Sequence, residues 1–147
     1  MSVQTFSLKI HGEQPVSKNI KVKECKCKDG SDTILCDVPF VQNFVQPIRD
    51  HFNKPIIVMS AFRTPEYNKK VGGTNNSYHM QGRAFDIRID GVAPIEIARH
   101  AEKLGIKGII LYDTGFVHID SRNGITEKKY WAKKIKDTYI PVSTFQG

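Results

Sequence analysis

Apolar and polar residues alternate in two stretches near the start of the chain, at residues 6–10 and 20–23. An alternation with period two is typical of strands that bury one face. Residues 28–32 then read Lys-Asp-Gly-Ser-Asp, a composition that favours a turn. We therefore expect residues 1–36 to form a hairpin-rich N-terminal subregion.

A different period follows this subregion. Apolar residues recur there at spacings of three and four, which predicts an amphipathic helix. The residues that share this spacing are Phe40, Val41, Phe44, Val45, Ile48 and Phe52. Pro47 lies inside the pattern, and a bend is expected there because proline lacks the N–H that a helix needs.

Short elements come next. The apolar run at residues 55–59 has the length of a strand. Thr64 is placed to cap a brief helix over residues 65–70, which a Gly-Gly pair ends. Residues 74–82 are expected to form a loop.

The remaining expected elements are one helix and three strands. The helix covers residues 94–104, with Gly105 as its stop signal. The strands cover residues 84–89, 107–112 and 116–120. This mixture predicts an α+β fold with a central antiparallel sheet flanked by helices.

No repeat, low-complexity segment or linker divides the chain, and 147 residues suffice for one hydrophobic core. We expect a single domain over residues 1–147, in which residues 37–131 form the core that carries the functional site. No stretch approaches the roughly 18 consecutive apolar residues that a membrane-spanning helix needs. We therefore expect no membrane association.

The chain is basic, with 22 lysine and arginine residues against 15 aspartate and glutamate residues and a net charge of +7. Such a charge favours a polyanionic partner through long-range attraction. The basic residues are scattered apart from lysine clusters within residues 21–28 and 128–136. No arginine-rich helix or aromatic-basic pattern marks a nucleic-acid module, which makes nucleic acid the weaker alternative.

Three cysteines, Cys25, Cys27 and Cys36, lie within twelve positions. Their odd number argues against a disulfide framework. A structural zinc site seeded by the C-x-C pair would lack a fourth ligand at the usual spacing. We expect reduced, partly buried thiols, while one disulfide from Cys36 to Cys25 or Cys27 stays open for a protein that works outside the cell.

His79, Asp86 and His118 are candidate metal ligands. His79 and Asp86 are seven positions apart where the expected loop meets a strand, and His118 comes from a later strand. Two imidazoles and one carboxylate suit Zn²⁺, and three protein ligands leave a fourth position for the water that a hydrolase activates. The net positive centre would lower the pKa of that water towards about 7.

The spacing alone is a weak signal, because each of these side chains could face solvent on an alternating strand. Their apolar neighbours strengthen it. Asp86 lies in an Ala-Phe-Asp-Ile run and His118 in a Gly-Phe-Val-His-Ile run, where an unpaired polar group would be costly to bury. A metal ion between the two side chains would satisfy both.

Three sequence blocks, in this order, resemble the D-Ala-D-Ala metallopeptidase family. They are S-A-F-R-T-P-E-Y-N at residues 60–68, N-S-Y-H-M-Q-G-R-A-F-D at 76–86 and G-F-V-H-I-D at 115–120. The resemblance reaches from about residue 20 to residue 131 and is strongest to the endopeptidase branch. The family includes zinc D,D-carboxypeptidases, the vancomycin-resistance dipeptidase, murein endopeptidases and phage endolysins, and its fold is similar to that of the Hedgehog signalling domain.

The resemblance implies that His79, Asp86 and His118 hold one Zn²⁺ per chain. Arg63 matches the family arginine that engages the substrate near the scissile bond, a task that suits the rigid fork of guanidinium donors. A surface salt bridge is the alternative for Arg63. Ser77 matches the serine beside the first ligand, able to hydrogen-bond the site or the substrate, and a turn hydroxyl is its alternative.

Aromatic residues near these blocks are candidates for the wall of a substrate groove. They are Phe62, Tyr78, Phe85, Tyr112 and Trp131. Aromatic residues more often form core, and we expect only Tyr78 and Trp131 to be exposed near the cleft, with Tyr78 contacting the substrate. The histidines outside the blocks are read as ordinary surface or helix residues.

The general base is where the chain departs from the family pattern. Many members have an acid three residues before the last histidine, and here that position is Gly115. Asp113 could reach the metal-activated water if the turn over residues 113–115 folds back, and we favour it as the base. Asp120 lies on the same strand face as His118 by period two, so it could instead orient the imidazole.

The function that the resemblance implies is zinc-dependent hydrolysis of peptide bonds in the stem or cross-bridge of peptidoglycan, by a D,D-carboxypeptidase or a murein endopeptidase. We expect a monomer. The first fourteen residues lack the features of a secretory signal, so we expect a cytoplasmic protein or a phage-encoded lysin released at lysis. The alternatives are an inactive zinc-bound binding module of the same fold and, more weakly, a nucleic-acid-binding domain.

Overall fold

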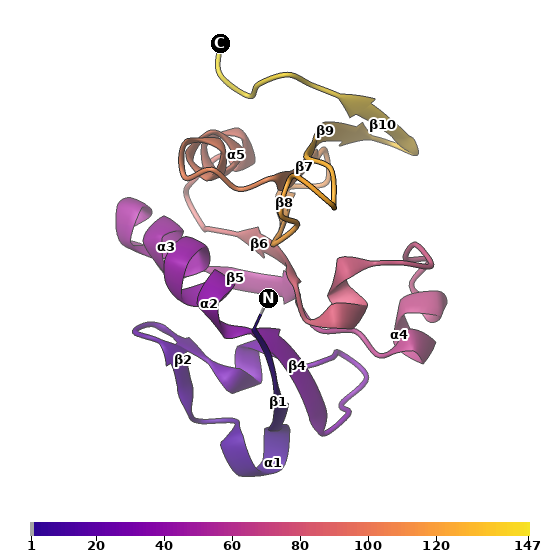
Figure 1. Ribbon diagram of the computed structural model, residues 1–147. Coiled ribbons are helices and arrows are strands. Elements are labelled where there is room, and N and C mark those ends of the chain that lie inside the picture. Colours follow the sequence, from indigo (N-terminus) through magenta and orange to yellow (C-terminus); the bar gives the residue numbers. More distant parts are fainter. Residues whose placement is uncertain (1) are drawn as a thin grey trace.

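Figure 1 shows the computed structural model, which describes residues 2–147. The elements in chain order are β1 (Val3–Ser7), α1 (Leu8–His11), β2 (Pro15–Ser17), β3 (Ile20–Lys21), η1 (Val22–Cys25), β4 (Thr33–Asp37), α2 (Val38–Phe40), η2 (Val41–Val45), α3 (Gln46–Phe52), β5 (Ile57–Ser60), α4 (Pro65–Lys70), η3 (Tyr78–Gln81), β6 (Ala84–Arg88), α5 (Pro94–Lys103), β7 (Gly108–Tyr112), β8 (Phe116–Asp120), β9 (Tyr130–Ile135) and β10 (Thr138–Pro141). Of the short elements, η1 and η3 are 3₁₀ helices and η2 is a π-helical segment.

The largest sheet has six strands in the order β10-β9-β7-β8-β6-β5. Neighbouring strands are antiparallel, except that β7 and β9 run parallel. Two small antiparallel sheets, β1 with β4 and β2 with β3, lie in the N-terminal part of the chain (Figure 1). The expected α+β fold with a central, mainly antiparallel sheet is confirmed.

One face of the large sheet is packed and the other carries polar groups. Val117 and Ile119 of β8 are fully buried in the same hydrophobic core as Ile97 of α5. Helix α5 packs against β7 and β8, and α3 packs against α5. Because side chains alternate along a strand, His118 and Asp120 point to the opposite face. The helices therefore leave that face available for chemistry.

The amphipathic helix expected over residues 40–52 is present as α2, η2 and α3 in succession. The N–H of Gln46 donates to the carbonyl of Val41, five residues earlier, directly before Pro47. Since proline has no N–H to continue the regular ladder, the π-helical segment is where the helix adjusts. The brief helix capped by Thr64 and the helix ended by Gly105 are also as expected.

The strands expected at residues 6–10 and 20–23 are wrong in their extent. The first ends at Ser7, whose hydroxyl accepts the Ile10 N–H at 3.2 Å and caps the helix α1. The second ends at Lys21, after which the chain turns into η1. Alternation continues past both ends, but capping by Ser7 and by the carboxylate of Asp32, which accepts the Lys9 N–H, ends the first strand.

The sheet continues beyond residue 131 through β9 and β10. Neither strand was among the expected elements. The residues of β10 are exposed at every position and show no apolar alternation. None of the helices within residues 2–147 combines the length and the apolar character needed to cross a membrane.

Candidate metal centre

His79 is presented by the short helix η3, whose start and end are both defined by local chemistry. The Ser77 hydroxyl accepts the His79 N–H at 3.2 Å and caps the helix. At its end Gly82 has φ +73 and packs against the backbone of Leu35, a position that leaves no room for a side chain. The His79 Nδ1–H donates to the Ala61 carbonyl at 2.7 Å, which leaves Nε2 free as a ligand atom.

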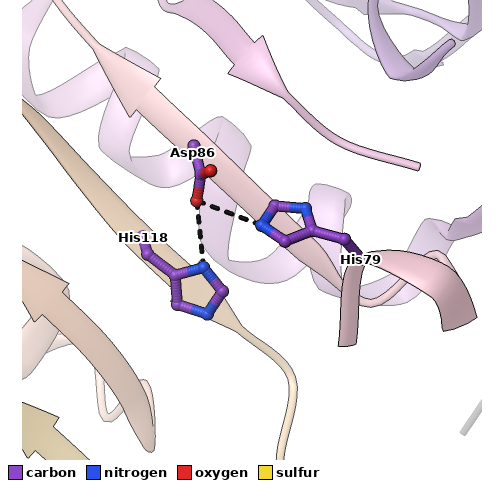
Figure 2. A group of neighbouring side chains, drawn as sticks. All are labelled: His79, Asp86 and His118. Carbon is purple, nitrogen blue, oxygen red and sulfur yellow. Dashed lines mark hydrogen bonds and ion pairs between the residues drawn. The ribbon is translucent and has the colours of Figure 1, made fainter. Parts of the chain in front are cut away.

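Asp86 and His118 meet because they are directly paired residues on the adjacent strands β6 and β8. Asp86 Oδ1 lies 2.9 Å from His118 Nδ1 and 3.2 Å from His79 Nε2 (Figure 2). One ligand atom from each of the three residues lies within 4.8 Å of the others. In a tetrahedral zinc site with bonds of about 2.0–2.1 Å, ligand atoms are separated by about 3.3 Å, so this geometry fits the ion.

All three side chains are buried, and each has a partner that offsets the cost. Burial alone would raise the pKa of Asp86, but the imidazoles of His79 and His118 hold that pKa below its ordinary value. Burial would lower the pKa of His118, but the carboxylates of Asp120 and Asp86 raise it to about 9. A buried carboxylate shared by two imidazoles is a donor set that suits Zn²⁺.

Asp120 makes the contact with His118 that period two predicted. Its Oδ2 accepts the His118 Nε2–H at 2.8 Å, so His118 turns Nδ1 towards Asp86. Asp120 is fully buried, and Arg122 donates to both of its oxygens at 2.8 and 2.7 Å. A carboxylate held in this way orients the imidazole and increases its basicity as a ligand.

Arg63 lies beside the three candidate ligands. Its Nη2 is 3.5 Å from Asp86 Oδ2, while Nε donates to the Ser60 hydroxyl at 3.1 Å and Nη1 to the Asn68 side chain at 3.2 Å. The side chain is 16% exposed and lines a cavity. The alternative of a simple surface salt bridge does not describe this arrangement, since the guanidinium is fixed by three partners next to the candidate metal ligands.

A family model described as "Peptidase M15" matches residues 17–120 of the chain. This chain belongs to the peptidase M15 family. The family resemblance noted in the sequence is thereby confirmed, and all three candidate ligands lie inside the matched segment.

Two relatives show which members of the M15 family the chain is similar to. One is the probable peptidoglycan L,D-endopeptidase MepK of Haemophilus influenzae, 36% identical over 75 residues, or 47% of this chain and 40% of that protein. The other is the peptidoglycan L,D-endopeptidase MepK of Escherichia coli K12, 32% identical over 74 residues, or 46% of this chain and 41% of that protein. The chain thus spans about two fifths of the length of these relatives.

A cavity of about 450 Å³ opens over the candidate metal centre of this M15 peptidase. His79, Asp86 and His118 line it, together with Arg63, Ser77 and other residues. Ser77 is buried and its hydroxyl accepts the His79 N–H. This contact agrees with the alternative interpretation of Ser77 as a hydroxyl that stabilises a turn, here at the wall of the cavity.

The expected aromatic wall is present in part. Tyr78 lines the cavity, with its ring 5.1 Å from the guanidinium carbon of Arg83 and 4.8 Å from that of Arg122. Tyr112 lines the cavity as well. Trp131 does not, because its indole N–H donates to the Ile106 carbonyl and its ring packs near Phe145. The other two candidates, Phe62 and Phe85, are buried in the core.

Asp113 is exposed and is not among the residues that line the cavity. Its Oδ2 accepts the backbone N–H of Lys136 at 3.0 Å, which ties it to the β9–β10 turn rather than to the metal centre. The Asp113 N–H also donates to the Lys134 carbonyl at 3.0 Å, so the backbone of Asp113 is held by β9. The geometry therefore gives no support to the prediction that Asp113 is the general base.

Several cavity residues were missed by sequence reasoning because they follow the last family block. They are Arg122, Tyr130, Lys134 and Tyr139, all outside the segment matched by the M15 family. Only the pairing of β9 with β7 and of β10 with β9 brings the last three to the cavity. Nothing local in a lysine-rich stretch indicates that register.

The three cysteines are free and buried. Cys36 Sγ lies 3.9 Å from Cys25 Sγ, while Cys27 Sγ is near the Thr64 hydroxyl. Within residues 2–147, the His79–Asp86–His118 group is the one set of three or more possible ligands that could hold a metal ion. The expectation of reduced thiols agrees with this arrangement, although the structure buries them fully rather than partly.

Proposed function

We propose that this M15 peptidase is a zinc-dependent enzyme that hydrolyses a peptide bond in bacterial peptidoglycan. The observation that carries the proposal is the convergence of His79 Nε2, Asp86 Oδ1 and His118 Nδ1 at the wall of an open cavity. The substrate class is supported by the printed activity of the MepK relatives, which are peptidoglycan L,D-endopeptidases. Of the two activities considered, these names favour an endopeptidase over a D,D-carboxypeptidase.

The residues of the chain would divide the work as their contacts suggest. When bound at this site, Zn²⁺ supplies a Lewis acid that lowers the pKa of a water molecule towards about 7 and polarises a carbonyl group. Asp120 and the Ala61 carbonyl hold the imidazoles of His118 and His79 with one nitrogen each facing Asp86. Arg63 would donate to the substrate carbonyl oxygen and stabilise the negative charge that develops there as water adds to the carbonyl carbon.

The decisive experiment incubates the zinc-loaded protein with purified muropeptides and follows the products by mass spectrometry. We expect cleavage by the wild type and none by His79→Ala. His51→Ala serves as the matched control, because His51 is exposed and lies outside the cavity. Absence of cleavage of every stem and cross-linked muropeptide by metal-replete protein would contradict the proposal.

Metal content measured on the same samples separates the alternatives. An inactive zinc-bound module would hold one Zn²⁺ per chain and cleave nothing. A nucleic-acid-binding domain would bind polynucleotide with an affinity that falls steeply with salt and is indifferent to a chelator. Monomeric action, and a cytoplasmic or phage-lysin origin, stay predictions from the sequence that gel filtration and fractionation would test.

A further inference from the structure

A row of four side chains crosses the sheet beside the metal centre. Tyr112 of β7 is directly paired with Phe116 of β8 on one side and with Lys134 of β9 on the other, and Lys134 is paired with Tyr139 of β10. Paired residues share a face of the sheet, so these four side chains form one row. All four line the cavity.

Lys134 is the cation of this row. Its Nζ lies 5.4 Å from the ring centre of Tyr112 and 5.1 Å from that of Tyr139. Within residues 2–147 no carboxylate lies within 4.0 Å of Lys134 Nζ. The two aromatic faces hold the ammonium group in place without neutralising its charge.

The other cations of the cavity have partners already, and Arg63 is the residue proposed above to meet the carbonyl oxygen of the scissile bond. Arg122 is held by both oxygens of Asp120, and Arg63 by Ser60, Asn68 and Asp86. Asp86 is the one carboxylate among the lining residues, and it faces the two imidazoles. An anionic group that enters the cavity would therefore find Lys134 as a free partner, in a partly desolvated space where charges interact more strongly than in water.

The row lies close to the reaction centre. His118 pairs with Ile110 of β7, which pairs with Ala132 of β9. The row is offset from this line by two residues, since Phe116 precedes His118 by two positions while Tyr112 and Lys134 follow Ile110 and Ala132 by two. Two positions correspond to about 7 Å, and the step from β8 to β9 is two strands, or about 10 Å. The backbone of Lys134 is thus about 12 Å from that of His118, a span that about three to four extended peptide residues cover.

We propose that Lys134, held between Tyr112 and Tyr139, is a specificity-determining residue that binds a carboxylate of the substrate peptide within about three to four residues of the scissile bond. This inference rests on the proposed function, because the peptide whose carboxylate Lys134 would bind is the peptidoglycan substrate of that proposal. The ligand class is a peptide whose backbone or side chain carries a free carboxylate, as opposed to a carboxamide at the same place.

The test compares two substrates that differ only in this group: muropeptides with free stem-peptide carboxylates and the same muropeptides with those groups amidated. We expect the wild type to prefer the free acid about tenfold in kcat/KM, mainly through KM. In Lys134→Met the side chain keeps its length but loses its charge, and the preference should collapse to near one. Lys134→Arg should restore most of it.

Lys133→Met is the matched control. Lys133 is the neighbouring residue of β9 and points to the opposite face of the sheet, and its substitution changes the net charge by the same amount. It should keep the wild-type preference. A preference retained in Lys134→Met, or lost equally in Lys133→Met, would overturn the inference.

Binding to the metal-free protein separates this inference from the proposed function. Isothermal titration with the tripeptide L-Ala-γ-D-Glu-meso-diaminopimelate and its fully amidated form needs no catalysis. Tighter binding of the acid that disappears in Lys134→Met supports the subsite even where no muropeptide is cleaved. Equal binding of acid and amide by the wild type would refute the subsite even where cleavage is observed.

Discussion

The carboxylate of Asp120 occupies the space in which a side chain at position 108 would lie. A Cβ atom built on Gly108 would overlap the Asp120 carboxylate, and Gly108 and Asp120 are directly paired on β7 and β8. Because Asp120 accepts the His118 Nε2–H, the absence of a side chain at position 108 leaves room for the contact that orients a candidate metal ligand.

Gly108→Ala should therefore weaken the metal centre without touching a ligand. We expect the zinc affinity to fall about 10- to 100-fold, the range seen when a partner that orients a metal-bound histidine is lost. Competition with a chromophoric chelator measures it, and circular dichroism confirms that the variant is folded. A folded variant with wild-type affinity would show that the Asp120 contact is dispensable.

The two acids nearest to His118 in the sequence, Asp113 and Asp120, should respond differently to removal of their charge. Asp113 ties down the Lys136 N–H at the surface, so Asp113→Asn should keep kcat within about twofold. Asp120→Asn should lower zinc affinity and activity together, because the amide cannot reproduce the buried pair with His118 and Arg122. A large loss of kcat in Asp113→Asn at normal zinc occupancy would reinstate Asp113 as the general base.

The grouping of the three candidate metal ligands was predictable from the sequence, and the walls of the cavity were not. His79, Asp86 and His118 lie in local blocks whose family resemblance implies zinc, and the apolar neighbours of Asp86 indicate its burial. Of the two acids near His118 in the sequence, Asp113 was favoured as the general base and Asp120 as a residue that could orient the imidazole. The period of β8 indicated the role of Asp120, whereas the direction of the turn that carries Asp113 depends on β9 and β10, which the sequence did not reveal.

Zinc removal should destabilise the folded protein, because a ligand that binds only the native state adds to its stability. Free Zn²⁺ at a hundred times its Kd contributes about 2.7 kcal/mol, which for a chain of this size corresponds to a Tm shift of about 5–10 °C. Differential scanning fluorimetry with and without chelator measures the shift. The Tm of His79→Ala should change little on addition of zinc or of chelator. The control His51→Ala, which replaces an exposed histidine, should show the same Tm shift as the wild type.

The Arg83–Glu127 pair should make stability depend on pH. Arg83 is buried and donates to both oxygens of Glu127 at 2.6 Å, and this hydrogen bonding lowers the pKa of Glu127. A carboxylate with a lowered folded pKa stabilises the protein above its unfolded pKa of about 4.3, and this contribution is lost as the pH falls through the folded pKa.

Glu127→Gln should therefore reduce the free energy of unfolding by about 1–3 kcal/mol at pH 7, and the difference from wild type should shrink below about pH 4. Urea unfolding at several pH values measures both. Glu96→Gln removes the more exposed pair with Arg99 and should cost less than about 0.5 kcal/mol. A pH-independent deficit in Glu127→Gln would point to lost packing rather than lost charge.

The cysteines should be unreactive in the native state. Cys25, Cys27 and Cys36 are buried, and the neighbouring Cys36 thiol together with burial raises the pKa of Cys25, which disfavours its reactive thiolate. We expect Ellman's reagent to find no rapidly reacting thiol in native protein and three after denaturation in guanidinium chloride. Fewer than three in denatured, unreduced protein would reveal a disulfide, with Cys25 and Cys36 the nearest pair.

Every candidate zinc ligand precedes residue 121, whereas Lys134 and Tyr139 belong to the β9–β10 hairpin that follows it. The reaction and the choice of substrate would thus be encoded in separate, consecutive stretches of the chain. A hairpin at the edge of a sheet can be lengthened, altered in charge or replaced without moving the other strands of the sheet. Grafting a different hairpin here would be a direct route to redirecting the enzyme towards other peptides.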